Sequence, residues 1–205
     1  MELLKKTFSL ALILVSTHFF AQENKTTQSA FSKSFSLEAK KMYDEAVASL
    51  KDVYDEKSYP INARLGWLLY LDKNYSSSIV YYQKAINLMP AATEPLWAIL
   101  NPQIAMEKWT DVEKTYLAIL KLDPKNSTAH FKLGMIYYYR KNYTAAKKYF
   151  DVSLNLFPLD YDSMLMSAWN NYFLGNTADA KILFNKVLLL YPEDASSKEG
   201  LGLIK

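Results

Sequence analysis

The chain has 205 residues, of which 50% are hydrophobic and 22% are charged, so it can bury a core and is not disordered throughout. The formal net charge is only +3, and the Lys and Arg residues form no cluster long enough to follow a phosphate backbone. Nucleic acid is therefore not expected as a partner. Cysteine is absent, which excludes disulfides, thiolate nucleophiles and iron–sulfur sites.

Residues 1–21 have the pattern of a secretory signal peptide. Lys5 and Lys6 precede an apolar run that ends at the small residue Ala21. We expect cleavage after Ala21, and a protein that is exported to the periplasm or secreted. Phe19 is bulky at a position where cleavage sites prefer a small residue, so a shifted site or an uncleaved anchor stays open as an alternative.

The next segment, residues 22–36, is polar, rich in Ser and Thr and without a period, and we expect it to be a flexible tether. Apolar residues at helical spacing follow, and no Gly, Asn or Pro interrupts the stretch from Leu37 to Tyr54. This stretch predicts one long helix. We interpret residues 37–58 as a degenerate half repeat that covers the open face of the repeat after it.

Prolines mark an internal repeat in the rest of the chain, because Pro90, Pro124, Pro158 and Pro192 are spaced by 34 residues. Residues such as Asn74 interrupt each repeat in its middle, and proline cannot continue a helix interior, so each repeat is predicted as helix, turn, helix, turn. The repeats cover residues 59–92, 93–126, 127–160 and 161–194, and residues 195–205 begin a further helix that caps the last repeat.

Within the repeats, side chains of one size recur at fixed places. Small residues occupy the eighth and twentieth places, where two helices must approach closely: Gly66, Gly134, Ala168, Ser78, Ala146 and Ala180. Aromatic residues share the twenty-fourth place: Tyr82, Tyr116, Phe150 and Phe184. The repeat over residues 93–126 departs from this pattern, because Leu100 and Val112 replace small residues. Pro102 also lies inside its first helix, where we expect a kink that either repacks the core or reshapes a binding groove.

The third repeat, which runs from His130, Phe131, Lys132, Leu133 and Gly134 through Asn142 and Tyr143 to Pro158, resembles the tetratricopeptide repeat family. The resemblance implies an all-α fold, a right-handed α-solenoid of helix-turn-helix units in which residues 59–92 are the first repeat and residues 93–126 a degenerate second one. It also implies a concave groove, lined by the first helix of each repeat, that binds other proteins.

Carrying the groove places of the family over to this chain gives a mostly aromatic set of candidate partner-binding residues: Trp67, Tyr70, Trp97, Asn101, Phe131, Met135, Tyr138, Tyr139, Trp169, Tyr172 and Phe173. An apolar or aromatic peptide segment is the ligand that such a groove would hold. Trp97 and Tyr138 are expected on the open groove, whereas Phe150 and Phe184 are expected in the core.

These features predict an exported adaptor or scaffold whose partner is a protein or peptide. A structural subunit of a cell-envelope assembly, with the convex face or an edge as a permanent interface, is the alternative. We expect neither enzyme activity nor a cofactor, a metal or a small-molecule substrate, because His130 is the one histidine left after cleavage and occupies a packing place. Contact with a membrane is expected only if residues 1–21 remain attached.

The cleavage site can be tested on the exported protein. Mass spectrometry of the protein isolated from outside the cytoplasm should give a mature chain that starts near Gln22. An intact segment from Met1 to Ala21, recovered with the membrane fraction, would instead show an uncleaved anchor.

Overall fold

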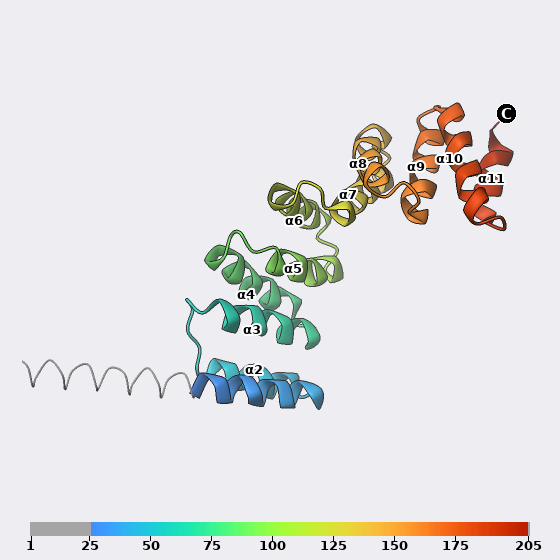
Figure 1. The fold of residues 1–205 in the computed structure, drawn as a ribbon. Helices are drawn as coiled ribbons and strands as arrows, with labels where there is room; N and C mark the ends of the chain where they lie inside the picture. Colours follow the sequence, from blue (N-terminus) through green and yellow to red (C-terminus); the bar gives the residue numbers. More distant parts are fainter. Residues whose placement is uncertain (1–25, 205) are drawn as a thin grey trace, which may run out of the picture. The chain divides into compact units, whose positions relative to one another are not determined.

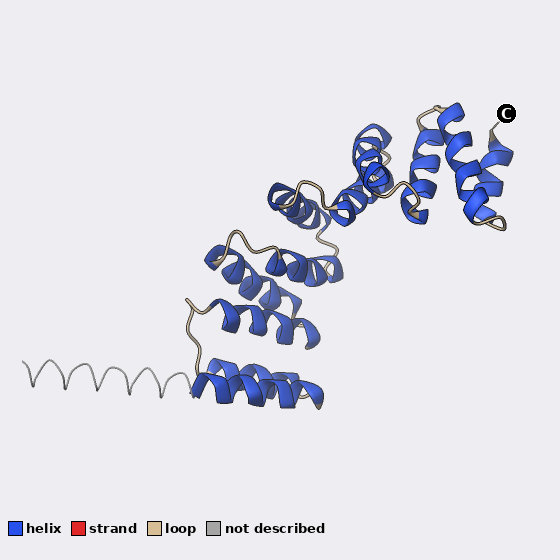
Figure 2. Cartoon of the chain, in the orientation of Figure 1, coloured by secondary structure: helices blue, strands red, loops and turns tan. Residues whose placement is uncertain are grey.

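The structure is a computed structural model that describes residues 26–204, and every regular element in this part of the chain is an α-helix (Figures 1 and 2). A helix over residues 26–39 comes first, and the others follow in chain order: α2 (Tyr43–Lys51), α3 (Tyr59–Leu71), α4 (Tyr75–Leu88), α5 (Glu94–Ala105), α6 (Trp109–Leu122), α7 (Ser127–Tyr139), α8 (Tyr143–Leu156), α9 (Tyr161–Phe173), α10 (Thr177–Leu190) and α11 (Ala195–Leu203). The expected all-α helical-repeat fold is confirmed. The signal-peptide prediction concerns residues outside the described range.

None of the helices described between residues 26 and 204 is long and apolar enough to cross a membrane.

The chain divides into two compact units, an N-terminal unit that ends at Met106 and a C-terminal unit that starts at Glu107. The division falls between α5 and α6, inside the repeat over residues 93–126. This is the repeat in which Leu100 and Val112 stand at the places of small residues, and both side chains are buried. Helix α5 continues through Pro102 to Ala105, so the proline does not end it.

Each unit has its own core. In the N-terminal unit, Ala46, Leu50, Ile61, Leu65 and Leu68 form a buried cluster. In the C-terminal unit, the largest fully buried side chains come from successive helices: Val112, Ile119, Leu133, Phe150, Met164, Phe184 and Val187. Phe150 and Phe184 are therefore core residues, as expected from their place in the repeat.

A residue with a left-handed backbone follows the first helix of each pair. Lys73 and Lys141 have φ values of 63° and 56°, and Gly175 has 79° at the same place. The next residue closes the turn, because the backbone N–H of Asn74 donates to the carbonyl of Leu69 at 2.8 Å.

The asparagines of these turns do not themselves adopt the left-handed conformation, because the φ values of Asn74 and Asn142 are -82° and -88°. Asn74 and Asn142 instead cap the second helix, since their side-chain oxygens accept from the backbone N–H groups of Ser77 and Ala145 at 3.3 and 3.2 Å.

The start of the described chain differs from the sequence interpretation. The expected tether over residues 22–36 is helical from residue 26, and the single helix expected from Leu37 to Tyr54 is two helices. The break lies at Lys41, whose φ is 60°, and the N–H of Met42 donates to the carbonyl of Leu37 at 2.9 Å. No Gly or Asn marks this turn, so the sequence carried no signal for it.

The helix over residues 26–39 is held by apolar burial. Ala30 is part of the core cluster of the N-terminal unit, and Phe31 and Leu37 pack against this cluster. It therefore supplies the partner of α2 that the sequence interpretation lacked.

The two helices of a pair approach closely at the glycines in the eighth place of the repeat. A Cβ atom added at Gly66 would lie 2.8 Å from the ring of Tyr82, and one at Gly134 would lie 2.5 Å from the ring of Phe150. Gly200 of α11 meets Phe184 in the same way, at 2.3 Å. Aromatic rings thus occupy the space that a side chain at these glycines would need.

Gly134→Ala should destabilise the protein by about 1–3 kcal/mol, because the methyl group forces Phe150 out of its position in a close-packed core. Gly202→Ala is the matched control, since a Cβ atom there meets nothing within 4 Å. The control should be neutral or should stabilise α11 by up to about 1 kcal/mol. Urea denaturation of the two variants measures both effects, and equal midpoints would contradict the close approach.

Candidate functional site

Six aromatic side chains of the C-terminal unit form a continuous network, which we name the aromatic surface. Its members come from the last turns of α7 and α9 and the first residue of α8: Tyr138, Tyr139, Tyr143, Trp169, Tyr172 and Phe173. All but Tyr143 belong to the predicted groove set. Helix periodicity places Trp169, Tyr172 and Phe173 on one face of α9, because residues three or four apart share a face, and the packing of α7, α8 and α9 brings the other rings to them.

Phe173 is the centre of this network. Its ring stacks on Tyr143 with the centroids 5.0 Å apart and the planes at 11°. It also lies 5.9 Å from Tyr138, 5.3 Å from Tyr172 and 6.1 Å from Trp169. Aromatic pairs at these separations attract each other beyond simple burial, so the rings hold one another in place.

The inner side of the aromatic surface rests on the core. Tyr138 contacts Phe150 at 6.4 Å, and Trp169 contacts Phe184 edge-on at 5.1 Å. The indole Nε1 of Trp169 donates to the hydroxyl of Ser196 in α11 at 2.8 Å. Burial raises the pKa of Tyr138 to about 12, because its phenolate would lie in apolar surroundings. Tyr138 is thus more deeply packed than an open groove residue.

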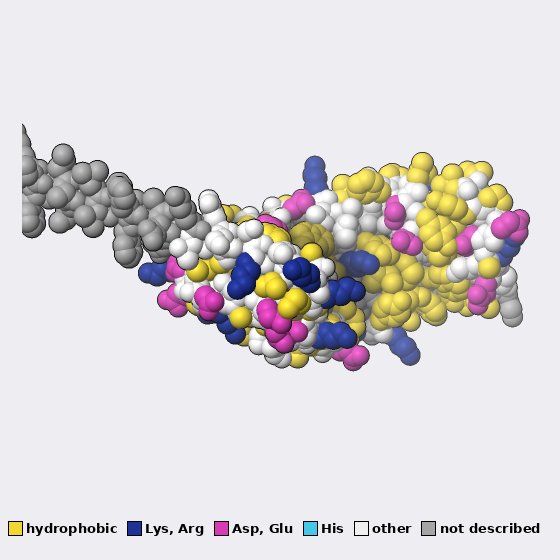
Figure 3. Space-filling view, turned by 90° about the horizontal axis from the view of Figure 1, so that it is seen from below, with side chains coloured by type: hydrophobic (Ala, Val, Ile, Leu, Met, Phe, Trp, Pro, Cys, Tyr) yellow, Lys and Arg dark blue, Asp and Glu magenta, His cyan; other side chains and the backbone are white. Residues whose placement is uncertain are grey.

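The outer side is exposed. Tyr139 is 74% exposed and Phe173 is 47% exposed, which is unusual for large apolar rings. The space-filling view shows hydrophobic side chains gathered over the C-terminal unit (Figure 3). A rigid apolar surface of this kind can bind another apolar surface without first reorganising.

The other predicted residues of the C-terminal unit lie deeper. Phe131 is half-buried and contacts Phe150 at 5.8 Å, and Met135 is also half-buried. His130 donates from Nε2 to the carbonyl of Pro124 at 3.0 Å and lies beside the ring of Tyr149. Its contacts are those of a packed side chain.

In the N-terminal unit, the predicted residues Trp67 and Tyr70 contact each other at 5.8 Å, and both are half-buried. The Nε1 of Trp67 donates to Glu38 of the helix over residues 26–39 at 2.7 Å, and Arg64 forms an ion pair with the same carboxylate. The indole N–H of Trp67 is therefore already hydrogen-bonded within the N-terminal unit.

Trp97 and Asn101 of α5 complete the predicted set in this unit, and they are half-buried and exposed, respectively. A cavity of about 360 Å³ lies beside α3 and α5, and its lining includes Ala63, Trp67 and Ala98.

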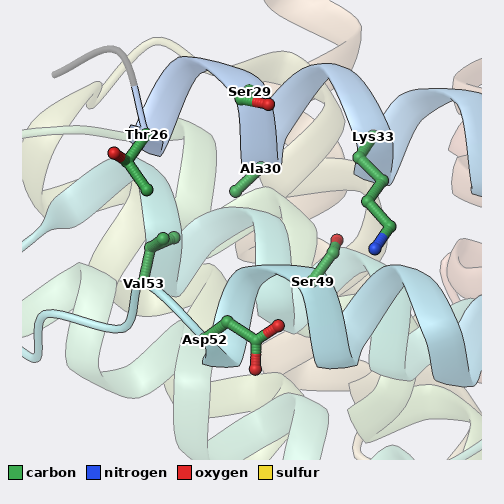
Figure 4. Close-up of a pocket in the computed structure, with 7 residues that line it drawn as sticks. All are labelled: Thr26, Ser29, Ala30, Lys33, Ser49, Asp52 and Val53. Atoms are coloured by element: carbon green, nitrogen blue, oxygen red, sulfur yellow. The ribbon is translucent and has the colours of Figure 1, made fainter. Parts of the chain in front are cut away.

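A second cavity of the N-terminal unit, of about 590 Å³, lies between the helix over residues 26–39 and α2 (Figure 4). Small and polar side chains line it, among them Ser29, Ala30 and Ser49, with Lys33 on the first helix and Asp52 directly after the end of α2. The sequence interpretation missed this cavity because residues 22–36 were assigned to a tether. Its lining offers no aromatic surface.

Tyr143 is the functional candidate that sequence reasoning missed. It is the first residue of α8, and the centroid of its ring lies 5.5 Å from that of Tyr138. Tyr75 at the same place of the first repeat contacts Tyr70 at 5.9 Å. The recurrence of Asn-Tyr at both turns was the signal that could have found it.

The described part of the chain brings together no group of three or more His, Cys, Asp or Glu side chains that could hold a metal ion.

Tyr139→Ala should change the free energy of unfolding by no more than about 0.5 kcal/mol, because the ring is largely in solvent. Phe150→Ala should cost about 3–5 kcal/mol, because it empties a fully buried site. Thermal or urea unfolding compares them. A similar loss in both variants would mean that Tyr139 is part of the core.

Comparisons with known proteins agree with the helical-repeat fold. Two family models described as tetratricopeptide repeat match residues 127–160 and 162–194. No curated protein sequence matches the chain.

Solved structures share the fold at low sequence identity. A tetratricopeptide repeat protein from Parabacteroides merdae has a TM-score of 0.70 at 19% identity, with 86% of this chain and 71% of that chain covered. The protein MamA has a TM-score of 0.69 at 15% identity, with 88% and 96% covered. YrrB, described as a TPR protein with an unusual peptide-binding site, has 0.68 at 14%, with 89% and 95% covered. Residues 127–160 and 162–194 are therefore tetratricopeptide repeats, and the described chain shares the fold of tetratricopeptide repeat proteins.

Proposed function

We propose that the aromatic surface of the C-terminal unit binds an apolar or aromatic peptide segment of a partner protein. Tetratricopeptide repeats make this chain a scaffold for protein–protein interaction, and the proposal adds the place and the chemistry of the contact. The observation that carries it is the half-exposed ring of Phe173 at the centre of a network anchored on Phe150 and Phe184.

The chemistry of the surface favours an apolar ligand over a charged one. Its six members are Tyr, Trp and Phe side chains, which carry no formal charge, and burial raises the pKa of Tyr138 to about 12. The neighbouring cation Arg140 is already paired with Glu113 of α6, a carboxylate that also accepts from Tyr137. A ligand therefore gains most by burying apolar area against Phe173 and Tyr139.

The aromatic surface can bind a peptide tightly because its large rings offer a wide area of contact. Tyr, Trp and Phe lose little side-chain entropy on binding, and Trp and Tyr are enriched where a few residues carry most of the binding free energy. The likeness of the fold to YrrB supports a peptide ligand, because that protein is described as having a peptide-binding site. The location and chemistry of our site rest on the contacts within this chain.

We further propose that the scaffold acts outside the cytoplasm, in the periplasm or as a secreted protein. This part rests on the signal-peptide pattern of residues 1–21 alone. The partner would then be another exported or envelope protein. The proposal involves no catalytic step and no cofactor.

A panel of synthetic peptides tests the binding site. Peptides that carry Phe, Trp or Leu in a polar background should bind the protein, and Phe173→Ala should weaken that binding about 10- to 50-fold, as expected for the central residue of an interface. Isothermal calorimetry or fluorescence anisotropy gives the dissociation constants. Thermal melts show whether the variant remains folded.

The control is Val80→Ala, which removes an apolar side chain that is 54% exposed on α4, outside the aromatic surface. It should leave peptide binding unchanged. Equal binding by wild type and the Phe173 variant, or equal losses in both variants, would show that the aromatic surface is not the binding site.

A further inference from the structure

The outer face of α10 is apolar although nothing in the C-terminal unit covers it within the described residues. Ile182 is 65% exposed and Leu189 is 80% exposed. Ala178 and Asn185 are exposed on the same face, so the four positions are spaced by four, three and four residues. This is the spacing of the contact seam between two helices that pack side by side. We name these four residues the outer stripe.

The outer stripe lies opposite the face that α10 uses in its own unit. Ala180, Phe184 and Val187 point into the core and are fully buried. At 3.6 residues per turn, these positions project about 180° away from Ile182 and Leu189. The stripe therefore takes no part in the fold of its own unit.

The second helices of the other repeats do not share this feature. At the same four places they carry mostly polar or charged residues: Ser76, Val80, Gln83 and Asn87 in α4, Thr110, Lys114, Leu117 and Lys121 in α6, and Thr144, Lys148, Asp151 and Asn155 in α8. A helix face exposed to water is normally polar, so the face of α10 has a different function from its equivalents.

We propose that α10 pairs with α10 of a second copy of this chain, in antiparallel orientation about a two-fold axis. Such a contact is self-complementary, because the same face serves both copies. In this orientation, Leu189 of one copy lies over Ala178 of the other, so that a large side chain fills the space beside a small one. Parallel pairing would instead place Ala178 opposite Ala178 and leave a gap.

The charges beside the outer stripe favour the same orientation. Asp179 and Lys186 flank one edge of the stripe, and Lys181 flanks the other. In antiparallel helices each edge faces the same edge of the other copy, which brings Asp179 of each copy near Lys186 of the other. In parallel helices opposite edges meet, and Lys181 would lie near Lys186. The antiparallel pair therefore gains two attractive contacts where the parallel pair has two repulsive ones.

Cysteine crosslinking tests the pairing and its orientation on the full chain as it is recovered from its host. The chain has no cysteine, so Ala178→Cys and Leu189→Cys each introduce a single thiol. In a glutathione redox buffer, a disulfide-linked dimer should form when the two variants are mixed. Neither variant alone should crosslink, because in the antiparallel pair identical residues lie about 16 Å apart along the axis.

The matched control uses the same two places on α8. A mixture of Thr144→Cys and Asn155→Cys should give no crosslinked dimer, since that face is polar. Crosslinking of Ala178→Cys with itself would overturn the antiparallel orientation. No dimer from the α10 mixture, or as much dimer from the α8 control, would overturn the proposal.

A charge exchange gives an independent measurement. Asp179→Lys should raise the dissociation constant of self-association at least tenfold in sedimentation velocity, because each contact then has two lysines. The double variant Asp179→Lys with Lys186→Asp should restore it, since opposite charges meet again. Failure of the second change to restore association would contradict the contact between these residues.

Discussion

The close approach of paired helices at the eighth place of the repeat is the constraint on which the rest of the structure depends. Gly66 and Gly134 leave room for the rings of Tyr82 and Phe150, which then fill the space between first and second helix. Phe150 is fully buried as a result. Its ring also contacts the ring of Tyr138. The position of the aromatic surface therefore depends on the core packing of the same repeat.

The repeat that lacks this approach is the one in which the chain divides. Leu100 and Val112 replace the small residues there, and the boundary between the two compact units falls between α5 and α6. Bulky side chains at a close-approach position prevent helices from packing at the same distance. Each unit consequently has its own core and its own exposed aromatic residues, and the network around Phe173 lies wholly within the C-terminal unit.

The two proposals for this unit use different faces. The aromatic surface contacts Phe184 through Trp169, on the buried side of α10, whereas the outer stripe lies on the opposite side of that helix. Peptide binding and self-association therefore do not compete for the same side chains. Two copies joined through α10 would present two aromatic surfaces, which raises the apparent affinity for a partner that carries several apolar segments.

The sequence by itself determined the repeat, the helix pairs from residue 59 onward and the core positions, because these depend on local spacing of small, aromatic and proline residues. Only the tertiary structure decided the helix over residues 26–39, whose weakly patterned sequence is held by burial of Ala30 against the core. The tertiary structure also decided which aromatic rings of the aromatic surface contact one another. Tyr143 and Phe173 are far apart in the sequence, and their stacking follows from how α8 and α9 pack, which no local pattern encodes.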